Sequence, residues 1–328
     1  MKHDLAAAMR TAQGFLRASD PMAATRTIQD ALSGASPRAP GLMDRLTRVP
    51  GGHAAAPVTP ATPGGRIETR HHTGPAGDRD YRLHVPAGPL TGVVVMLHGC
   101  TQDPDDFARG TRMDAAAAAH GLIVAYPRQT GAHNAQSCWN WFRPEDQSRT
   151  GGEPEIIAGI TRDILRDFDL PSRAACVAGL SAGGAMAAIL SETWPDLFAA
   201  AGIHSGLPTG AARDVVSAFG AMRGRGHDGE GDTPQVPRIV FHGTADHTVA
   251  VSNAAALMPG SGVETDHDLN GRDVTRLATD DGSELWLVTG AGHAWFGGDS
   301  AGSYADPLGP DASAEMIRFF AIHLAVAT

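Results

Sequence analysis

Continuous apolar runs alternate with segments of helical periodicity along most of this chain. A run such as V-V-V-M-L at 93–97 has no polar position and is typical of a strand buried on both faces of a parallel sheet. Strands are predicted at residues 93–97, 121–126, 175–179, 199–203, 238–242 and 284–288, and helices at 111–120, 153–168, 183–192 and 312–324. The alternation predicts an α/β fold, with a mostly parallel sheet and helices on both faces.

Three segments of different composition divide the chain. Residues 1–34 carry apolar positions at roughly helical spacing and predict a helical appendage. Residues 35–65 are rich in Pro and Gly and predict a linker. Residues 66–328 then predict a single larger domain, which begins with two alternating segments, 66–72 and 80–86, that favour antiparallel edge strands.

The charge balance argues against two classes of partner. The formal net charge is −10, and Lys2 is the only lysine. Binding to nucleic-acid phosphates or to an anionic membrane surface requires clustered Lys and Arg, which this chain lacks. The sequence therefore predicts no nucleic-acid partner and no membrane partner, and it leaves the oligomeric state open.

Targeting and metal-binding patterns are equally sparse. No stretch approaches the ~20 apolar residues that a membrane-spanning helix needs. Residues 1–34 show no ordinary secretory signal, so a cytoplasmic location is expected unless a leader has been removed. The three cysteines, Cys100, Cys138 and Cys176, are too few for a disulfide framework and lack Cys-x-x-Cys spacing, so no metal site is predicted.

The strongest chemical signal is the segment C-V-A-G-L-S-A-G-G-A-M at 176–186. It places G-x-S-x-G, with Ser181 at its centre, between a predicted buried strand and a predicted helix. Small residues at 179 and 183 permit a sharp strand-to-helix turn that projects the serine above the sheet. Ser181 is therefore the predicted nucleophile, although G-x-S-x-G also occurs in purely structural turns.

A serine hydroxyl needs a base, and that base needs an acid to orient it. In α/β-hydrolases the acid and then the histidine follow the nucleophile along the chain. Asp246 lies just past the strand at 238–242, and His293 lies in a Gly-containing loop after the strand at 284–288. These positions predict an α/β-hydrolase fold with a Ser181, His293 and Asp246 triad.

Neighbouring acidic and basic residues fit these roles less well. Asp280 and Asp281 lie in D-D-G-S, a pattern that predicts a hairpin turn. His242 and His247 flank Asp246 but precede it or lie too close to it in the sequence to serve as its partner.

An oxyanion hole needs two N–H donors aimed at one point. The backbone N–H of Ala182, directly after the nucleophile, is the first candidate. The backbone N–H of Cys100, in the loop L-H-G-C-T-Q at 97–102, is the second, and His98 is expected to shape this loop. We further hypothesise that Cys100 and Cys138 form a disulfide, the alternative being two free thiols, whereas Cys176 is predicted to be a core residue.

Aromatic residues near these loops are candidates for contacts with substrate. The run C-W-N-W-F at 138–142 supplies Trp139, Asn140 and Trp141, and Trp295 follows His293 by two positions. Each Trp is either part of a wall for an ester or packed inward. No organic cofactor is predicted, because a serine triad needs none.

Several of these motifs in order resemble the esterases of the poly(3-hydroxybutyrate) depolymerase family, in the α/β-hydrolase superfamily. The resemblance runs from about Tyr81 to the C-terminus. It rests on L-H-G-C-T-Q, S-C-W-N-W-F, A-G-L-S-A-G-G-A-M, H-G-T-A-D-H-T-V, G-H-A-W-F-G-G and S-Y-A-D-P-L-G-P-D-A-S.

The resemblance implies hydrolysis of short-chain hydroxyacid esters and oligomers through Ser181, Asp246 and His293. Family members are often exported. Those that act on crystalline polyester carry an additional binding domain after the catalytic one, and this chain ends at Thr328. Small-molecule or oligomeric esters, or amorphous polyester, are therefore the expected substrates.

Two other functions remain open from the sequence. Similar catalytic domains occur among feruloyl and acetylxylan esterases, so the acyl group is not determined. A non-catalytic binding protein with a hydrolase fold is the alternative of another class, and the presence of all three triad residues argues against it.

Overall fold

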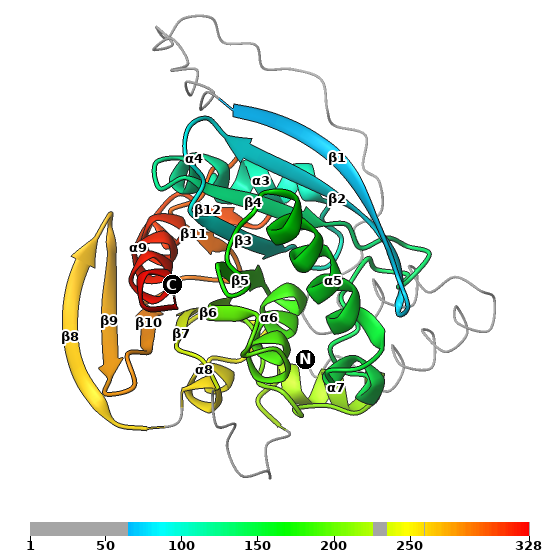
Figure 1. Ribbon diagram of the computed structural model, residues 1–328. Helices are drawn as coiled ribbons and strands as arrows, with labels where there is room; N and C mark the ends of the chain where they lie inside the picture. Colours follow the sequence, from blue (N-terminus) through cyan, green and yellow to red (C-terminus); the bar gives the residue numbers. More distant parts are fainter. Residues whose placement is uncertain (1–64, 226–234, 259, 328) are drawn as a thin grey trace, which may run out of the picture. The chain divides into compact units, whose positions relative to one another are not determined.

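A ten-stranded sheet in the order β1-β2-β4-β3-β5-β6-β7-β10-β9-β8 forms the centre of the computed structural model (Figure 1). The structure describes residues 65–225, 235–258 and 260–327. The predicted appendage over 1–34 lies outside the described residues, as does the predicted linker over 35–65 except for Gly65, the first residue of β1.

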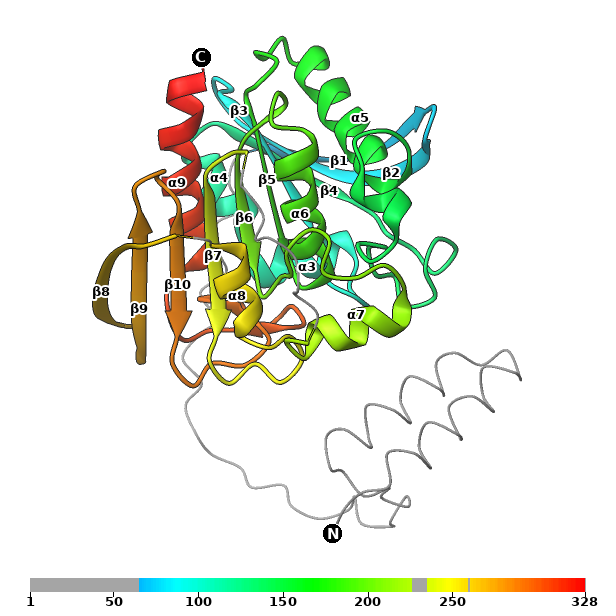
Figure 2. The ribbon, with the colours of Figure 1, turned by 90° about the horizontal axis from the view of Figure 1, so that it is seen from below.

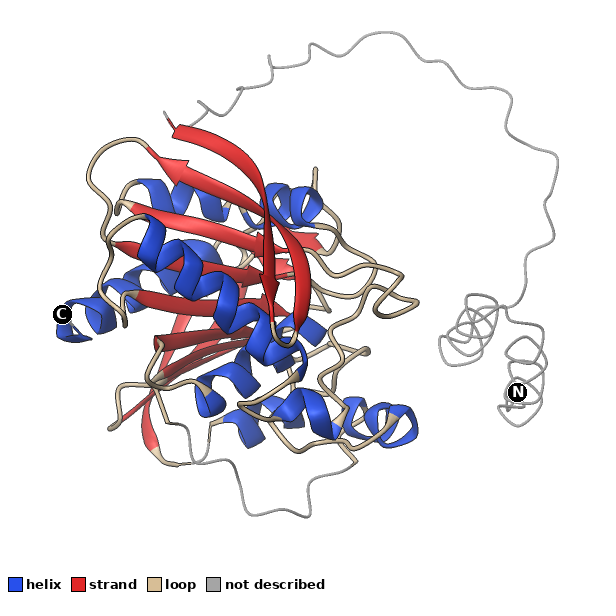
Figure 3. Cartoon of the chain, turned by 45° about the vertical axis from the view of Figure 1, so that its right-hand side comes forward, coloured by secondary structure: helices blue, strands red, loops and turns tan. Residues whose placement is uncertain are grey.

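The middle of the sheet consists of parallel strands, as the continuous apolar runs predict. They are β4 (Leu122–Pro127), β3 (Gly92–Leu97), β5 (Ala175–Leu180), β6 (Phe198–His204), β7 (Arg238–Gly243) and β10 (Glu284–Val288). Every residue of β3 to β7 is buried, because helices cover both faces of the sheet (Figure 3). The predicted α/β-hydrolase fold is confirmed.

Side chains of β3 alternate between two cores, one on each face of the sheet. Val93 and Val95 pack with α5, α6 and α8, whereas Val94 and Met96 pack with α3, α4 and α9. The first group of helices is α5 (Gly152–Asp167), α6 (Ala182–Thr193) and α8 (Ser252–Leu257). The second group is α3 (Pro104–Thr111), α4 (Met113–Ala118) and α9 (Ala312–Ala327).

The prediction of a single helix at 111–120 is wrong in its bounds. Two helices occupy this region and are separated at Arg112, whose φ of 52° breaks the helical path. The first begins earlier, because the Asp103 carboxylate accepts hydrogen bonds from the N–H groups of Asp105 and Asp106, both at 2.9 Å, and Pro104 suits the first helical position.

Antiparallel strands extend the sheet at both edges. The two predicted antiparallel strands are confirmed as a hairpin of β1 (Gly65–Gly74) and β2 (Gly77–Pro86), although only β1 lies at the edge, because β2 also pairs with β4. At the other edge, β9 (Arg272–Thr279) and β8 (Gly262–Leu269) were not predicted. The segment D-D-G-S joins β9 to β10 and makes the expected hairpin turn, with Gly282 at a φ of 84°.

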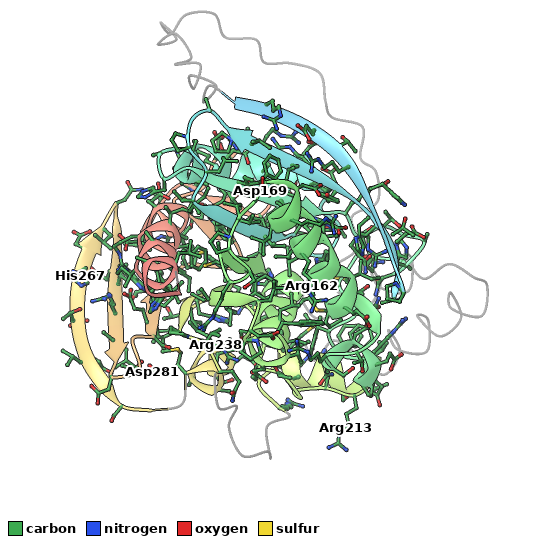
Figure 4. All side chains as sticks on the ribbon, in the orientation of Figure 1. Arg162, Asp169, Arg213, Arg238, His267 and Asp281 are labelled. Carbon is green, nitrogen blue, oxygen red and sulfur yellow. A yellow bond between two sulfur atoms is a disulfide. The ribbon has the colours of Figure 1, made fainter. Side chains whose placement is uncertain are left out.

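The long connections hold four shorter elements: η1 (Pro144–Gln147), α7 (Val215–Met222), β11 (Trp295–Phe296) and β12 (Ala305–Asp306). Helix α6 is fixed to the sheet by Arg238 of β7, a fully buried side chain labelled in Figure 4. Its guanidinium donates to Ser191 Oγ at 3.1 Å and pairs with Glu192. The helix that follows Ser181 is thereby held in place against β7.

Candidate active site

The three predicted triad residues lie at one edge of the sheet. Strands β5, β7 and β10 are parallel members of this sheet, so their carboxyl ends share an edge, and the arrowheads of β7 and β10 point the same way in Figure 2. Ser181 directly follows β5, Asp246 follows β7, and His293 follows β10. The edge is the one where open α/β sheets bind their ligands.

Ser181 occupies a tight turn between β5 and α6. Its φ of 57° and ψ of −118° lie in a region that non-glycine residues rarely adopt. The turn needs glycine on either side: a Cβ on Gly179 would lie 2.3 Å from the carbonyl carbon of Gly183, and one on Gly183 would lie 1.9 Å from the Leu97 oxygen. The G-x-S-x-G pattern is thus required by close backbone packing.

Asp246 and His293 form a hydrogen-bonded pair. His293 Nδ1 lies 2.7 Å from Asp246 Oδ2, and Asp246 Oδ1 accepts from the N–H groups of Thr248 and Val249, both at 2.8 Å. Burial acts to raise the pKa of Asp246, but the hydrogen bond and charge of His293, together with the N–H of Val249 and the nearby His242, lower that pKa overall. The ionised carboxylate keeps the proton on Nδ1, so Nε2 of a neutral ring is available as a base.

His204, at the end of β6, links the serine turn to the histidine loop. Its carbonyl accepts the N–H of Ser181 at 2.9 Å, and its Nε2 accepts the N–H of Phe296 at 3.2 Å. Burial and the nearby His242 and His293 lower the pKa of His204 well below its usual range, so the ring is neutral. Sequence reasoning missed this residue, although its place at a strand end is the signal that identified the triad.

The loop after β3 lies beside the nucleophile. A Cβ built on Gly99 would be 3.7 Å from Ser181 Cβ. Within this loop the N–H of Gly99 donates to Gln102 Oε1 at 2.9 Å, and the N–H of Thr101 donates to the Gln136 carbonyl at 2.8 Å. The N–H of Cys100 has no such acceptor within the part of the chain that the structure describes.

His98 stabilises the same loop, as predicted. Its Nδ1 donates to the Gly99 carbonyl at 2.8 Å, since its Nε2 accepts the N–H of Gln129 at 3.1 Å. Burial lowers the pKa of His98 to about 4, so the ring stays neutral near neutral pH. Both ring nitrogens are used within the fold.

The hypothesis of a disulfide between Cys100 and Cys138 is confirmed. It joins the loop after β3 to the 138–142 loop, and a buried carboxylate, Glu153 of α5, anchors the second loop by accepting from the N–H of Asn140 at 2.7 Å. Burial raises the pKa of Glu153 to about 6. Cys176 is buried in β5, as predicted.

The residues predicted to contact substrate lie inside the protein instead. Trp139 is 0% exposed and packs against His98, and Trp295 is 1% exposed and stacks on His204 with ring centroids 5.1 Å apart. Trp141 is also buried. The side chain of Asn140 is bonded to Glu153, since its Nδ2 donates to Glu153 Oε1 at 2.8 Å. The three Trp side chains therefore pack inward, which is the second of the two alternatives that the sequence leaves open.

Tyr304 is an exposed aromatic residue near the histidine that sequence reasoning did not select. The residue is 47% exposed, and its ring lies edge-to-face with that of His293. It belongs to S-Y-A-D-P-L-G-P-D-A-S, a segment noted in the sequence but given no role there.

The described part of the chain has neither a metal-binding cluster nor a membrane-spanning helix. No group of three or more His, Cys, Asp or Glu side chains in residues 65–225, 235–258 and 260–327 is arranged to hold a metal ion. None of the helices in these ranges combines the length and the apolar character that crossing a membrane requires.

The chain is similar to known esterases in sequence and fold. The sequence model of the family described as Esterase PHB depolymerase matches residues 80–262. Poly(3-hydroxyalkanoate) depolymerase C of Paucimonas lemoignei is 34% identical over 54% of this chain and 46% of its own length. The chain thus spans about half the length of that relative.

Other esterases are similar as well. Feruloyl esterase B of Neurospora crassa is 28% identical over 61% of this chain and 77% of that protein. Among solved structures, an acetyl xylan esterase from Aspergillus awamori superposes with a TM-score of 0.61 at 20% identity, over 78% of this chain and 100% of that one. This last likeness is one of fold.

Proposed function

The chain belongs to the esterase PHB depolymerase family, and we propose that it is a serine esterase with Ser181 as nucleophile, His293 as base and Asp246 as orienting acid. One observation carries the proposal. The hydrogen bond of 2.7 Å between His293 Nδ1 and Asp246 Oδ2 lies at the same sheet edge as a serine in a tight strand-to-helix turn.

The proposed reaction has two halves. Ser181 Oγ attacks the ester carbonyl carbon while His293 Nε2 takes the hydroxyl proton, and the tetrahedral intermediate collapses as His293 returns that proton to the leaving alcohol. Water, deprotonated by His293, then attacks the acyl-enzyme and releases the acid and free Ser181. Asp246 stays ionised throughout and stabilises the imidazolium that forms.

Two backbone N–H groups are proposed to stabilise the oxyanion. The N–H of Ala182 opens α6 and, as a first helical residue, has no acceptor within the helix. The N–H of Cys100 belongs to the loop whose Gly99 lies against Ser181. The positive end of α6 adds to the stabilisation of developing negative charge.

Short aliphatic hydroxyacid esters and their oligomers are the proposed substrates, in line with the named depolymerase among the relatives. A feruloyl or acetyl ester of a plant polysaccharide is the second candidate, in line with the feruloyl esterase. The burial of all three candidate Trp side chains favours the aliphatic acyl group, because these three side chains then offer a feruloyl ring no exposed surface on which to stack.

The test compares three esters with the unaltered protein and with Ser181→Ala as the blank: a soluble 3-hydroxybutyrate oligomer, methyl ferulate and ethyl butyrate. Acid release from the oligomer that Ser181→Ala abolishes would support the proposal. Preferential cleavage of methyl ferulate would move the substrate to the second candidate. Equal release by Ser181→Ala, with its fold intact by circular dichroism, would overturn the serine mechanism.

A further inference from the structure

Tyr304 is held in an unusual position at the active-site edge. Its φ of 51° lies in the left-handed region, which non-glycine residues seldom occupy. Nearly half of the side chain is exposed, so burial of the ring does not account for this backbone conformation. Strained backbone of this kind persists where the surroundings impose it, and it concentrates at functional sites.

The surroundings of Tyr304 impose its position from both sides. On one side, its carbonyl accepts the N–H of Trp295 at 2.7 Å, within the short pairing of β11 with β12. On the other, Asp106 of α3 accepts the N–H of Ser303 at 2.9 Å and also bonds its hydroxyl.

Hydrogen bonds to Ser303 also connect Tyr304 to the loop after β3, which carries the proposed oxyanion donor Cys100. Gln102 donates from Nε2 to the Ser303 carbonyl at 3.1 Å and accepts the Gly99 N–H on its Oε1. The Tyr304 hydroxyl lies 3.5 Å from Thr101 Oγ1. The exposed phenol is therefore fixed relative to the loop that carries the Cys100 N–H.

The ring of Tyr304 also faces the proposed base. Its centroid lies 6.5 Å from that of His293 with an interplanar angle of 81°, an edge-to-face contact. Because His293 must return a proton to the leaving oxygen, the alcohol part of the ester extends on the His293 side of the reacting carbonyl. Tyr304 lies on this side.

We propose that Tyr304 is a specificity residue for the alcohol part of the ester, with its ring packing against that part and its hydroxyl donating a hydrogen bond to an oxygen it carries. In a hydroxyacid oligomer the alcohol part bears a carbonyl or carboxylate, whereas a simple alkyl ester has no such acceptor. The inference rests on the proposed esterase function and adds a reason why hydroxyacid esters are preferred.

The experiment uses two esters with the same acyl group and different alcohols, ethyl butyrate and 3-butyryloxybutyrate. Tyr304→Phe keeps the ring and removes the hydroxyl. It should lower kcat/KM for 3-butyryloxybutyrate about tenfold, mainly through KM, because a hydrogen bond to a charged acceptor is lost. It should change kcat/KM for ethyl butyrate by no more than about twofold, since the ethyl group carries no acceptor for the hydroxyl.

Two controls separate specificity from structure. Ile322→Ala shortens a side chain of α9, and this residue is also about half exposed. It should change kcat/KM for neither ester. The thermal midpoint of Tyr304→Phe should match that of the unaltered protein.

Each outcome decides a different point. An equal loss on both esters, or no loss on either, would overturn the role of Tyr304 while leaving the esterase function standing. Failure of the unaltered protein to cleave either ester would instead overturn the proposed function, and the inference about Tyr304 with it.

Discussion

Breaking the disulfide between Cys100 and Cys138 should cost both stability and rate, by amounts that can be stated in advance. Cys138→Ser is the informative change, because it removes the bond without substituting Cys100, the residue that carries the proposed oxyanion donor. The bond closes a loop with a sequence separation of 38 residues. In the chain-entropy model, opening a loop of this length lowers the free energy of unfolding by about 4 kcal/mol.

The rate should fall by less than the loss of an oxyanion donor, which typically costs about 10²–10³ in kcat. The loop keeps its other attachments, since the N–H of Thr101 donates to the Gln136 carbonyl at 2.8 Å and Gln102 bonds the N–H of Gly99. We expect a loss of about tenfold in kcat with KM little changed, because the oxyanion forms in the transition state.

The assay is urea unfolding followed by circular dichroism, with and without reductant. The unaltered protein should lose about 4 kcal/mol on reduction, whereas Cys138→Ser should be insensitive to reductant. Cys176→Ala is the matched control, because it removes the buried free thiol and should keep the full sensitivity. A loss below about 1 kcal/mol on reduction, or a reductant effect of equal size in Cys138→Ser, would refute the reasoning.

Three further predictions concern single positions. Gly183→Ala should yield little folded protein, because its Cβ would lie 1.9 Å from a backbone oxygen, whereas Gly131→Ala, where a Cβ meets nothing within 4 Å, should fold normally in the same expression and thermal-melt assay. For Glu153, burial raises the pKa to about 6 from an ordinary 4.5, so the folded state holds its proton to higher pH than the unfolded state. The free energy of unfolding should therefore fall by about 1.5 kcal/mol between pH 4.5 and 6.5 relative to Glu153→Gln, and parallel urea-unfolding profiles for the two proteins would contradict this. Asp246→Asn should lower kcat by about 10⁴-fold with the fold intact, because the amide favours the wrong tautomer of His293; a loss below about tenfold in steady-state kinetics would remove Asp246 from its proposed role.

The central strands could be predicted from the sequence because burial on both faces leaves an unbroken apolar run, as in V-V-V-M-L of β3. The outer strands β8 and β9 could not. Strand β8 is exposed along nearly its whole length, so G-V-E-T-D-H-D-L has neither an apolar run nor alternation. Its pairing depends on the register with β9, which no local pattern reports.

The shared sheet edge of Ser181, Asp246 and His293 could be predicted because each lies in the connection after a predicted strand, so the topology alone brings the three residues to one edge. The direction in which a loop side chain points could not be predicted from the sequence. The sequence C-W-N-W-F is compatible with exposed rings, and only the buried Glu153, more than ten positions further on, accounts for how the loop around Asn140 is turned.

Tyr304 was missed for a similar reason. Its position is determined by Asp106 and Gln102, which lie about 200 positions earlier in the chain and bond to Ser303. A contact of this range has no signature in the periodicity around the tyrosine. The only local clue to Tyr304 would have been an aromatic residue a short distance after the predicted base in the sequence.

Covalent labelling with a fluorophosphonate tests the central claim most directly, because the reagent phosphonylates an activated serine hydroxyl with loss of fluoride. Peptide mass spectrometry should find one adduct, on Ser181, with none in Ser181→Ala and much slower labelling in His293→Ala. An adduct on another serine, or no adduct in folded protein that still cleaves ethyl butyrate, would contradict the proposed triad.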